Sequence, residues 1–254
     1  MRSQYHRAQI EMIIDHSEDL RSFIFATEEK IKSNPGQFVM VWLPGVDEKP
    51  ISLSNENMIT VKKIGPFTEK LFEKKEGEHI EIRGPYGNSF PSAGKNTVVG
   101  GGCGIAPLAY YIERYCHWIA GAVLAGKTKS DLIFLEDIME HTNVVAVTED
   151  GSHGIKGLAT DAEIPEGERY LVCGPEIMMQ KVAEKLIDTD VDPKRICVSM
   201  ERYMKCAVGI CGNCSFSGYR VCADGPIFRY DQVKDAPHFN KYERIRTGEL
   251  VKKI

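Results

Sequence analysis

Hydrophobic and polar residues alternate in short runs over the first third of the chain. Residues 37–42, 58–63 and 79–83 show this period of two, which is typical of strands with one buried face. Pairs of glycine, proline and asparagine separate these runs and predict turns between them. Short strands at this spacing predict an antiparallel β-barrel or sandwich for residues 1–93.

The pattern changes after residue 93. An apolar run at 97–99 leads into a glycine-rich segment, and helical and strand-like stretches then alternate at residues 108–118, 122–124, 144–147, 170–173 and 177–186. This is the βαβ pattern of a parallel sheet, so residues 94–197 are expected to form an α/β domain. Residues 198–254 form a third, polar and aromatic zone. The predicted fold class is a multidomain chain with α+β and α/β parts, whose zones pack together without a flexible linker.

Length and charge narrow the function classes. The 254 residues allow one large domain or two modest ones, and a net charge of −4 argues against a dedicated nucleic-acid binder. The longest apolar stretch, residues 118–126, is about half of the roughly 20 residues that span a bilayer. The N-terminal segment is charged and has no apolar signal-peptide core. We therefore expect a soluble, cytoplasmic protein with neither a membrane nor a nucleic acid as partner.

Four of the eight cysteines are concentrated near the C-terminus. Cys206, Cys211, Cys214 and Cys222 are separated by four, two and seven residues. Structural disulfides are not expected in a cytoplasmic protein, so this concentration indicates metal or redox chemistry. The first three cysteines have the plant-type spacing of [2Fe–2S] proteins, and four thiolates complete two tetrahedral irons. We predict a [2Fe–2S] cluster at these four residues.

Alternatives to this cluster remain open from the sequence. Gly209 and Gly212 give the segment conformational freedom and leave amide groups free to face sulfur. A zinc ion with four cysteine ligands is the main alternative, although zinc sites usually pair two short C-x2-4-C units across a longer gap. The last gap is shorter than in plant ferredoxins, so this is no appended ferredoxin domain. Cys116 and Cys197 are expected to be small buried hydrophobic residues.

A glycine-rich segment follows the first apolar run of the second zone. Glycines at 100, 101, 102 and 104 stand between a predicted strand and a predicted helix, where backbone can approach a pyrophosphate. The segment lacks the G-x-G-x-x-G spacing, so a tight turn is the alternative. Residues 173–175 (Cys-Gly-Pro) follow another strand and are expected to form the other lip of the same crevice. Residues 148–152 form a third edge of this crevice. Lys127 and Lys129 lie either near the 2′-phosphate of a bound dinucleotide or only in solvent.

These motifs together resemble the ferredoxin–NADP reductase superfamily over essentially the full chain. The resemblance implies an FAD-binding barrel, a nicotinamide-binding α/β domain, Ser52 near flavin N5 and residues 65–68 near the FAD phosphates. Lys49 stands where the family usually has an arginine, so it keeps the positive charge but cannot make two parallel hydrogen bonds to a phosphate. Ile51 stands where the family often has an aromatic residue. The cofactor-binding residues that the resemblance implies are Lys49, Pro50, Ile51, Ser52, Thr60, Val61, Lys62, Gly65, Phe67, Thr68, Gly100, Gly101, Gly102, Gly104, Pro107, Cys173, Gly174 and Pro175.

A narrower resemblance follows from residues 49–52, 148–152, 221–228 and the four cysteines. These segments are similar to the electron-transfer subunits of heteromeric dihydroorotate dehydrogenases of pyrimidine biosynthesis. The resemblance implies FAD, a [2Fe–2S] cluster and NAD as cofactors, and an FMN-containing dihydroorotate dehydrogenase catalytic subunit as partner in a heterotetramer. It also implies three domains: 1–93 for FAD, 94–197 for NAD and 198–254 for the cluster. We expect no catalytic side chain, because the cofactors carry the chemistry.

Two other functions remain open. Flavin subunits of some cytoplasmic hydrogenases and of sulfite or sulfide reductases share much of the C-terminal pattern, and a zinc-stabilised binding module without enzymatic activity is the third possibility. Aromatic and apolar residues of the last zone are expected either to contact the partner or only to pack that zone. They are Ile210, Phe216, Tyr219, Ile227, Phe228 and Tyr230.

Overall fold

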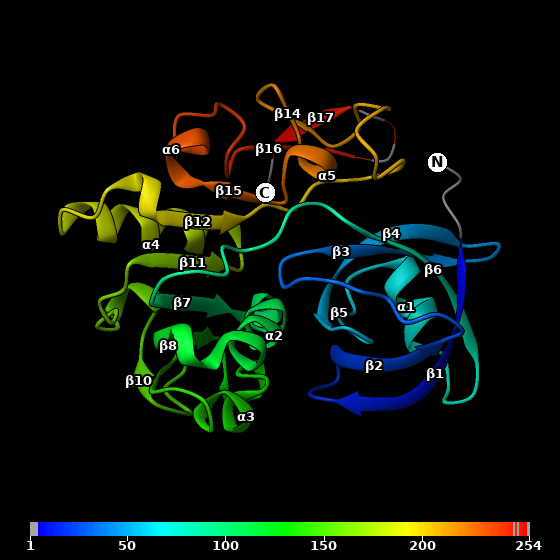
Figure 1. Cartoon of the computed structure of the whole chain (residues 1–254), viewed down its shortest axis with the longest axis horizontal. Coiled ribbons are helices and arrows are strands. Elements are labelled where there is room, and N and C mark those ends of the chain that lie inside the picture. The colour runs from blue at the N-terminus through cyan, green and yellow to red at the C-terminus, as the bar shows by residue number, and fades with distance from the viewer. Residues whose placement is uncertain (1–4, 246, 248, 253–254) are drawn as a thin grey trace.

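Six N-terminal strands close into an antiparallel barrel in the order β1-β2-β5-β4-β3-β6 (Figure 1). The computed structural model describes residues 5–245, 247 and 249–252. The barrel strands are β1 (His6–Asp15), β2 (Leu20–Thr27), β3 (Phe38–Leu43), β4 (Asp47–Asn55), β5 (Met58–Lys62) and β6 (His79–Tyr86). Alternate side chains fill its interior, among them Ile10, Phe23, Val39, Leu53, Ile59 and Ile82. The barrel prediction is confirmed, and β3, β5 and β6 correspond to the three alternating runs.

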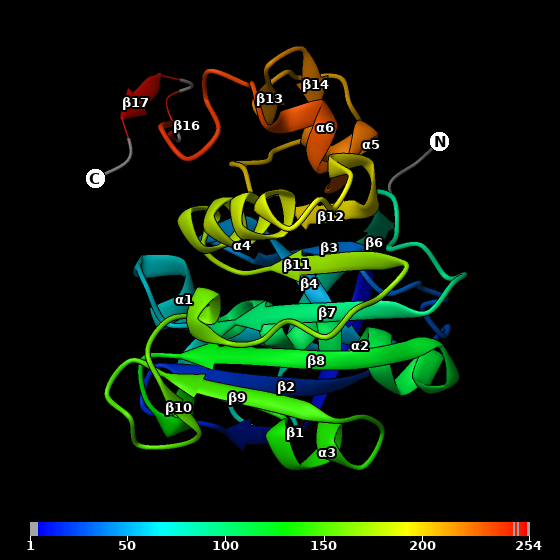
Figure 2. The same cartoon turned by 90° about the vertical axis from the view of Figure 1, so that its left-hand side faces the viewer.

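Seven strands form the second sheet in the order β10-β9-β8-β7-β11-β12-β15 (Figure 2). Its strands are β7 (Asn96–Gly101), β8 (Ile119–Gly126), β9 (Val144–Thr148), β10 (Ile155–Lys156), β11 (Arg169–Cys173), β12 (Ile196–Ser199) and β15 (Ile227–Arg229). All neighbouring strands are parallel except β12 and β15, which are antiparallel. The predicted α/β pattern is thus confirmed, with one antiparallel edge strand added.

Helices cover both faces of this sheet. The helices α2 (Ile105–Tyr115) and α3 (Leu135–Met139) pack with Val98 and Leu171 on one face. The helix α4 (Glu176–Asp188) packs with Val99 and Val172 on the other. Since neighbouring residues of one strand point to opposite faces, burial of both faces explains the continuous apolar runs in the sequence.

The C-terminal region lies across one end of both the barrel and the sheet (Figures 1 and 2). Its elements are β13 (Ser215–Phe216), β14 (Tyr219–Arg220), α5 (Val221–Asp224), α6 (Tyr230–Val233), β16 (Tyr242–Arg244) and β17 (Leu250–Lys252). Phe216, Phe228 and Tyr230 belong to the same buried cluster as the α4 side of the sheet. The remaining helix, α1 (Pro66–Phe72), follows β5 of the barrel.

The two boundaries between the three expected domains stay predictions. The boundary at 93/94 lies between β6 and β7, whereas the boundary at 197/198 falls within β12. Residues 1–4 of the charged N-terminal segment and residues 246, 248, 253 and 254 of the last predicted domain lie outside the described residues. Within the described part of the chain, no helix has the length and apolar character needed to cross a membrane.

Candidate functional site

The four clustered cysteines come together as two pairs. The amide of Cys211 donates a hydrogen bond to the Cys206 sulfur at 3.4 Å, and the two thiols also interact. The amide of Cys222, on α5, donates to the Cys214 sulfur at 3.5 Å, and these two thiols likewise interact. Cys211 is exposed, Cys206 is half-buried, and Cys214 and Cys222 are buried. The chain therefore presents two adjacent two-thiol sites.

Backbone amides of the loop also face sulfur. The amide of Ile210 donates to the Cys206 sulfur at 3.4 Å, and that of Gly209 donates to the Cys222 sulfur at 3.2 Å. Gly209 and Gly212 have φ of 76° and 73°, in the left-handed region that favours glycine. Amide groups arranged in this way stabilise negative charge on thiolates.

Hydrogen bonding distinguishes the thiols of the two pairs. Burial raises the pKa of Cys211, but hydrogen bonds with Asn213 and Cys206 outweigh it and lower this pKa to about 6. Burial, followed by the neighbouring Cys214 thiol, raises the pKa of Cys222 to about 12. Cys211 is therefore readily available as a thiolate ligand, whereas a metal would have to displace the proton of Cys222.

The donor set consists of four cysteine sulfurs, which lie as two pairs. Among residues 5–245, 247 and 249–252, no group of three His, Cys, Asp or Glu side chains is placed to hold one metal ion. A zinc ion with four cysteine ligands needs all four sulfurs around one centre. Two thiol pairs instead match two bridged irons, each with two cysteine ligands. The predicted cluster ligands are thus brought together, in an arrangement that fits the predicted group.

The two expected lips of the dinucleotide crevice are in contact. A Cβ atom added to Gly104 would lie 2.5 Å from the carbonyl oxygen of Cys173 and 2.6 Å from the Gly174 nitrogen. Gly104 is therefore required by the packing of one loop on the other. Gly102 differs, because it has φ of 53° and a Cβ there would meet no described atom within 4 Å. The backbone at Gly102 therefore borders open space.

The other predicted residues of this crevice lie on the elements that flank the glycine-rich loop. Gly100 and Gly101 end β7, and Pro107 is buried in the first turn of α2. A Cβ on Gly101 would lie 2.3 Å from the Met178 sulfur of α4, so this glycine also serves packing. Residues 148–152 contact the loop that carries Lys127 and Lys129, because the amide of Lys129 donates to the Ser152 hydroxyl at 2.8 Å.

The predicted flavin residues lie on three consecutive barrel elements. Residues 49–52 form the half-buried middle of β4, and Thr60, Val61 and Lys62 form the end of β5. Gly65 and Thr68 begin α1, with Phe67 buried between them. The Thr68 hydroxyl donates to the Gly65 carbonyl at 2.9 Å and accepts from the Gly65 amide at 3.1 Å. Ile51 packs against the barrel core.

A thiol contact joins β5, which carries predicted flavin residues, to the glycine-rich loop. The Cys103 thiol, between Gly102 and Gly104, donates to the Thr60 carbonyl of β5 at 3.6 Å. Burial, the largest cause, raises the pKa of this thiol to about 12, so it stays protonated. The structure thus places β5 directly beside the glycine-rich loop.

Sequence reasoning missed a row of buried polar side chains on this side of the barrel. His16 hydrogen-bonds Ser22 at 2.8 Å, Ser22 hydrogen-bonds Thr60 at 2.8 Å, and Ser54 donates to Thr60 at 2.7 Å. Ser22, Ser54 and Thr60 are buried. Single serines and threonines in strands gave no signal for this row, which forms only when β2, β5 and β4 pair.

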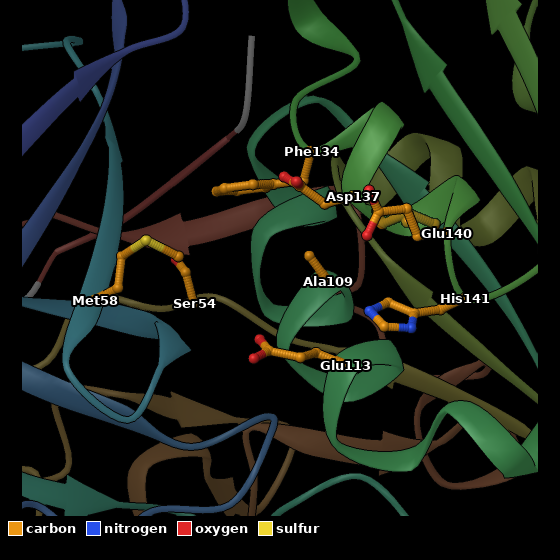
Figure 3. Close-up of a pocket in the computed structure, with 9 residues that line it drawn as sticks. Ser54, Met58, Ala109, Glu113, Phe134, Asp137, Glu140 and His141 are labelled. Carbon is orange, nitrogen blue, oxygen red and sulfur yellow. The ribbon is translucent and has the colours of Figure 1, made fainter.

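A cavity of about 290 Å³ lies between the barrel and the helices α2 and α3 (Figure 3). Ser54 and Met58 line its barrel side, and Glu113, Asp137 and His141 are among the residues opposite. In the described part of the chain, none of the predicted site residues lines this cavity. The cavity borders the predicted flavin residues through Ser54, which donates a hydrogen bond to Thr60 at 2.7 Å.

Comparisons with known sequences agree on one type of protein. The family model described as the iron–sulfur cluster binding domain of dihydroorotate dehydrogenase B matches residues 201–234. A protein of Pyrococcus horikoshii, described as a probable dihydroorotate dehydrogenase B (NAD(+)), electron transfer subunit, is 43% identical over 239 residues. That match covers 92% of this chain and 93% of the relative. A Methanocaldococcus jannaschii protein with the same description is 40% identical over 253 residues, covering 96% of each chain.

Solved structures share the fold. The structure of an NADH-dependent reduced ferredoxin-NADP oxidoreductase superposes with a TM-score of 0.77 at 28% identity and covers 95% of both chains. A ferredoxin NADP+ reductase from Neisseria gonorrhoeae with bound FAD and NADP has a TM-score of 0.63 at 20% identity. The second match covers 76% of this chain and 97% of the other, and at that identity it shows the fold alone.

Proposed function

This chain belongs to the family of dihydroorotate dehydrogenase B electron transfer subunits, and on that premise we propose that it carries electrons between a dihydroorotate-oxidising partner and NAD. It is an oxidoreductase subunit of pyrimidine biosynthesis. The observation that carries the proposal is the pairing of the four cysteines, of which Cys211 is exposed, in the C-terminal region of a chain with a reductase fold.

The residues proposed to hold each group are those that the resemblance implies and that the cysteine spacing indicates. Cys206, Cys211, Cys214 and Cys222 would hold the [2Fe–2S] cluster, and residues 49–52, 60–62, 65, 67 and 68 would hold FAD. Residues 100–102, 104, 107 and 173–175 would border the NAD site. When bound, FAD supplies hydride exchange with NAD(H) and single-electron exchange with the cluster. The chain's own contribution is to hold β5 against the glycine-rich loop through Cys103 and Thr60.

The partner-facing surface would lie at the tip of the cysteine loop. Ile210 is 84% exposed between two of the cluster cysteines, and Val208 is also exposed. Exposed apolar residues at such a site fit a protein interface. Phe216, Ile227, Phe228 and Tyr230 are buried, so the packing alternative applies to them and they are not available for docking. Tyr219 is half-buried.

Reconstitution with an FMN-bearing dihydroorotate dehydrogenase catalytic subunit tests this function. The chain alone should pass electrons from NADH to artificial acceptors without oxidising dihydroorotate, and the complex should couple dihydroorotate oxidation to NAD+ reduction. A heterotetramer is the expected assembly. If the complex forms but shows no NAD-dependent dihydroorotate turnover, another redox partner must be sought, such as a hydrogenase or a sulfide or sulfite reductase.

A matched pair of variants tests the docking surface. Ile210→Asp should impair the coupled reaction more than the artificial-acceptor rate, because it places a charge in the interface. Met139→Asp is the control, since Met139 is 58% exposed on α3, at the opposite end of the molecule (Figure 1). Equal effects of the two variants on coupling would contradict the placement of the interface.

A further inference from the structure

Arg83 reaches from barrel strand β6 to the backbone of the cysteine loop. One terminal nitrogen, Nη1, donates to the Cys206 carbonyl at 2.8 Å, and the other, Nη2, donates to the Lys205 carbonyl at 2.7 Å. Nε and Nη2 also donate to the two carboxylate oxygens of Glu48 at 2.6 and 2.7 Å, and Nη1 donates to the Tyr86 hydroxyl at 3.3 Å. A guanidinium has five N–H groups, so every donor of Arg83 has a partner.

This contact is buried and charged. The Arg83 side chain is 6% exposed and that of Glu48 is 18% exposed, and their two parallel hydrogen bonds form the bidentate arrangement that only arginine provides. Hydrogen bonding to Glu48 raises the pKa of Arg83, so the guanidinium remains charged. A lysine at this position could keep the charge, but its three N–H donors on one nitrogen could not reproduce the five hydrogen bonds that the planar guanidinium makes.

The backbone that Arg83 contacts lies next to a residue with an unusual conformation. Cys206 is the first cluster cysteine, and Ala207 immediately after it has φ of 62°, a conformation that non-glycine residues rarely adopt. Such a residue persists only when its surroundings hold it in place. The two carbonyls fixed by Arg83 belong to Lys205 and Cys206, directly before Ala207.

The other end of the contact lies on the flavin strand. Glu48 immediately precedes residues 49–52 on β4, where the flavin segment is proposed. The Lys49 ammonium lies over the Tyr203 ring, 4.7 Å from its centre, and adds a second link between β4 and the start of the loop. The Glu48–Arg83 pair therefore connects the proposed flavin strand with the first cluster ligand.

We propose that Arg83 is a positioning residue for the iron–sulfur cluster, which holds the backbone at Cys206 against the flavin strand and keeps a positive charge beside the cluster. This inference rests on the proposed function, because it requires a cluster at the four cysteines. A nearby positive charge stabilises the reduced, more negative state of a cluster, and the Glu48 carboxylate opposes that effect. Removal of the Arg83 charge should therefore make the cluster potential more negative, and removal of the Glu48 charge should make it more positive.

Four variants of the full chain, prepared anaerobically, test this role: Arg83→Gln, Arg83→Lys, Glu48→Gln and the control Arg21→Gln. Arg21, on β2, also pairs with a carboxylate and donates to a backbone carbonyl, that of Phe72, at 2.8 Å, but within the barrel region. The measurements are iron and labile sulfide per chain, FAD content, and the cluster midpoint potential from a titration followed by electron paramagnetic resonance.

Arg83→Gln should lose most of the iron while retaining FAD, and its remaining cluster should have a more negative potential. Arg83→Lys should retain more iron than Arg83→Gln because it keeps the charge. Glu48→Gln should shift the potential to a more positive value, and Arg21→Gln should match the wild type. Opposite shifts would not follow from a general loss of stability.

The inference is overturned if Arg83→Gln keeps wild-type iron, if Arg21→Gln loses as much iron as Arg83→Gln, or if Glu48→Gln leaves the potential unchanged. The Glu48→Gln potential decides the matter if Arg83→Gln does not fold. A wild-type chain that binds zinc and no iron would instead overturn the proposed function. The two failures are therefore distinguishable.

Discussion

The ammonium group of Lys49 lies 4.7 Å from the centre of the Tyr203 ring and 2.8 Å from a carboxylate oxygen of Asp47. Lys49 stands at the position where the resemblance implies the arginine of the flavin motif. A flavin phosphate at this position would share a cation that already contacts the segment leading to the cysteines. Loss of this cation should therefore affect both cofactor retention and local stability.

Lys49→Ala should weaken FAD binding by about 1.5–3 kcal/mol, because a hydrogen bond to a charged group is lost. The measurement is the FAD dissociation constant of the apoprotein. Tyr203→Leu is the control, since it removes the ring but keeps the ammonium. An exposed cation–π contact contributes about 0.5–1 kcal/mol. If both substitutions weaken FAD binding equally and by no more than this amount, Lys49 does not contact the phosphate.

Anaerobically purified protein should contain about two irons and two labile sulfides per chain. Cys211→Ser should lose most of this iron, because one of the two thiol pairs then lacks a ligand. Cys116→Ser, which changes a half-buried thiol outside the loop, should retain it. Metal analysis and the visible spectrum provide the test, and stoichiometric zinc without sulfide would contradict the assignment.

Two glycines of the same loop should respond differently to alanine. Gly104→Ala forces a Cβ against the Cys173 backbone, so it should lower the free energy of unfolding and release cofactors together. The Cβ of Gly102→Ala meets open space, so this substitution should lower the free energy of unfolding by only about 1–2 kcal/mol, because of the left-handed backbone. FAD and iron should be retained. The substitution should raise the dissociation constant for NADH by about tenfold. Thermal unfolding and NADH titration distinguish these outcomes, and unchanged NADH affinity in Gly102→Ala would contradict a dinucleotide at this loop.

Alkylation of the metal-free protein should depend on pH in a residue-specific way. With a pKa of about 6, Cys211 is mainly a thiolate above pH 6 and loses reactivity as the pH falls through that value. Cys222, with a pKa of about 12, stays protonated and slow throughout this range. Iodoacetamide labelling at pH 5 to 8, followed by peptide mass spectrometry, gives the two rates. Equal rates at pH 7 would show that the hydrogen bonds to Cys211 are absent in solution.

Local sequence patterns predicted those features that depend on neighbouring residues. The alternation at residues 37–42 predicted β3, because side chains two apart share one face of a strand. The spacing of Cys206, Cys211 and Cys214 predicted a ligand loop, since a short loop brings its own residues together. Resemblance to a family supplied the flavin segment, which periodicity alone would not have identified.

Contacts between distant residues could not be predicted in this way. Arg83 and Cys206 are 123 residues apart, and their contact depends on how the barrel and the C-terminal region pack. The burial of Phe216 was equally ambiguous, because an aromatic residue in a polar segment can face either a partner or the core. The pairing of β15 with β12 had no local signal, since β15 has only three residues.

That pairing bears on the order in which the protein is completed during synthesis. Strand β12 ends at Ser199, and its edge remains unpaired until β15, ending at Arg229, has been made. All four cluster cysteines lie in the intervening segment, so the sheet is completed only after every ligand has left the ribosome. A chain that stops at residue 200, after β12 and before the cysteines, would expose the buried edge of β12, which favours aggregation. The cysteine segment is therefore an insertion within the sheet's own connectivity, and truncation before it should yield an aggregating chain rather than a free-standing reductase.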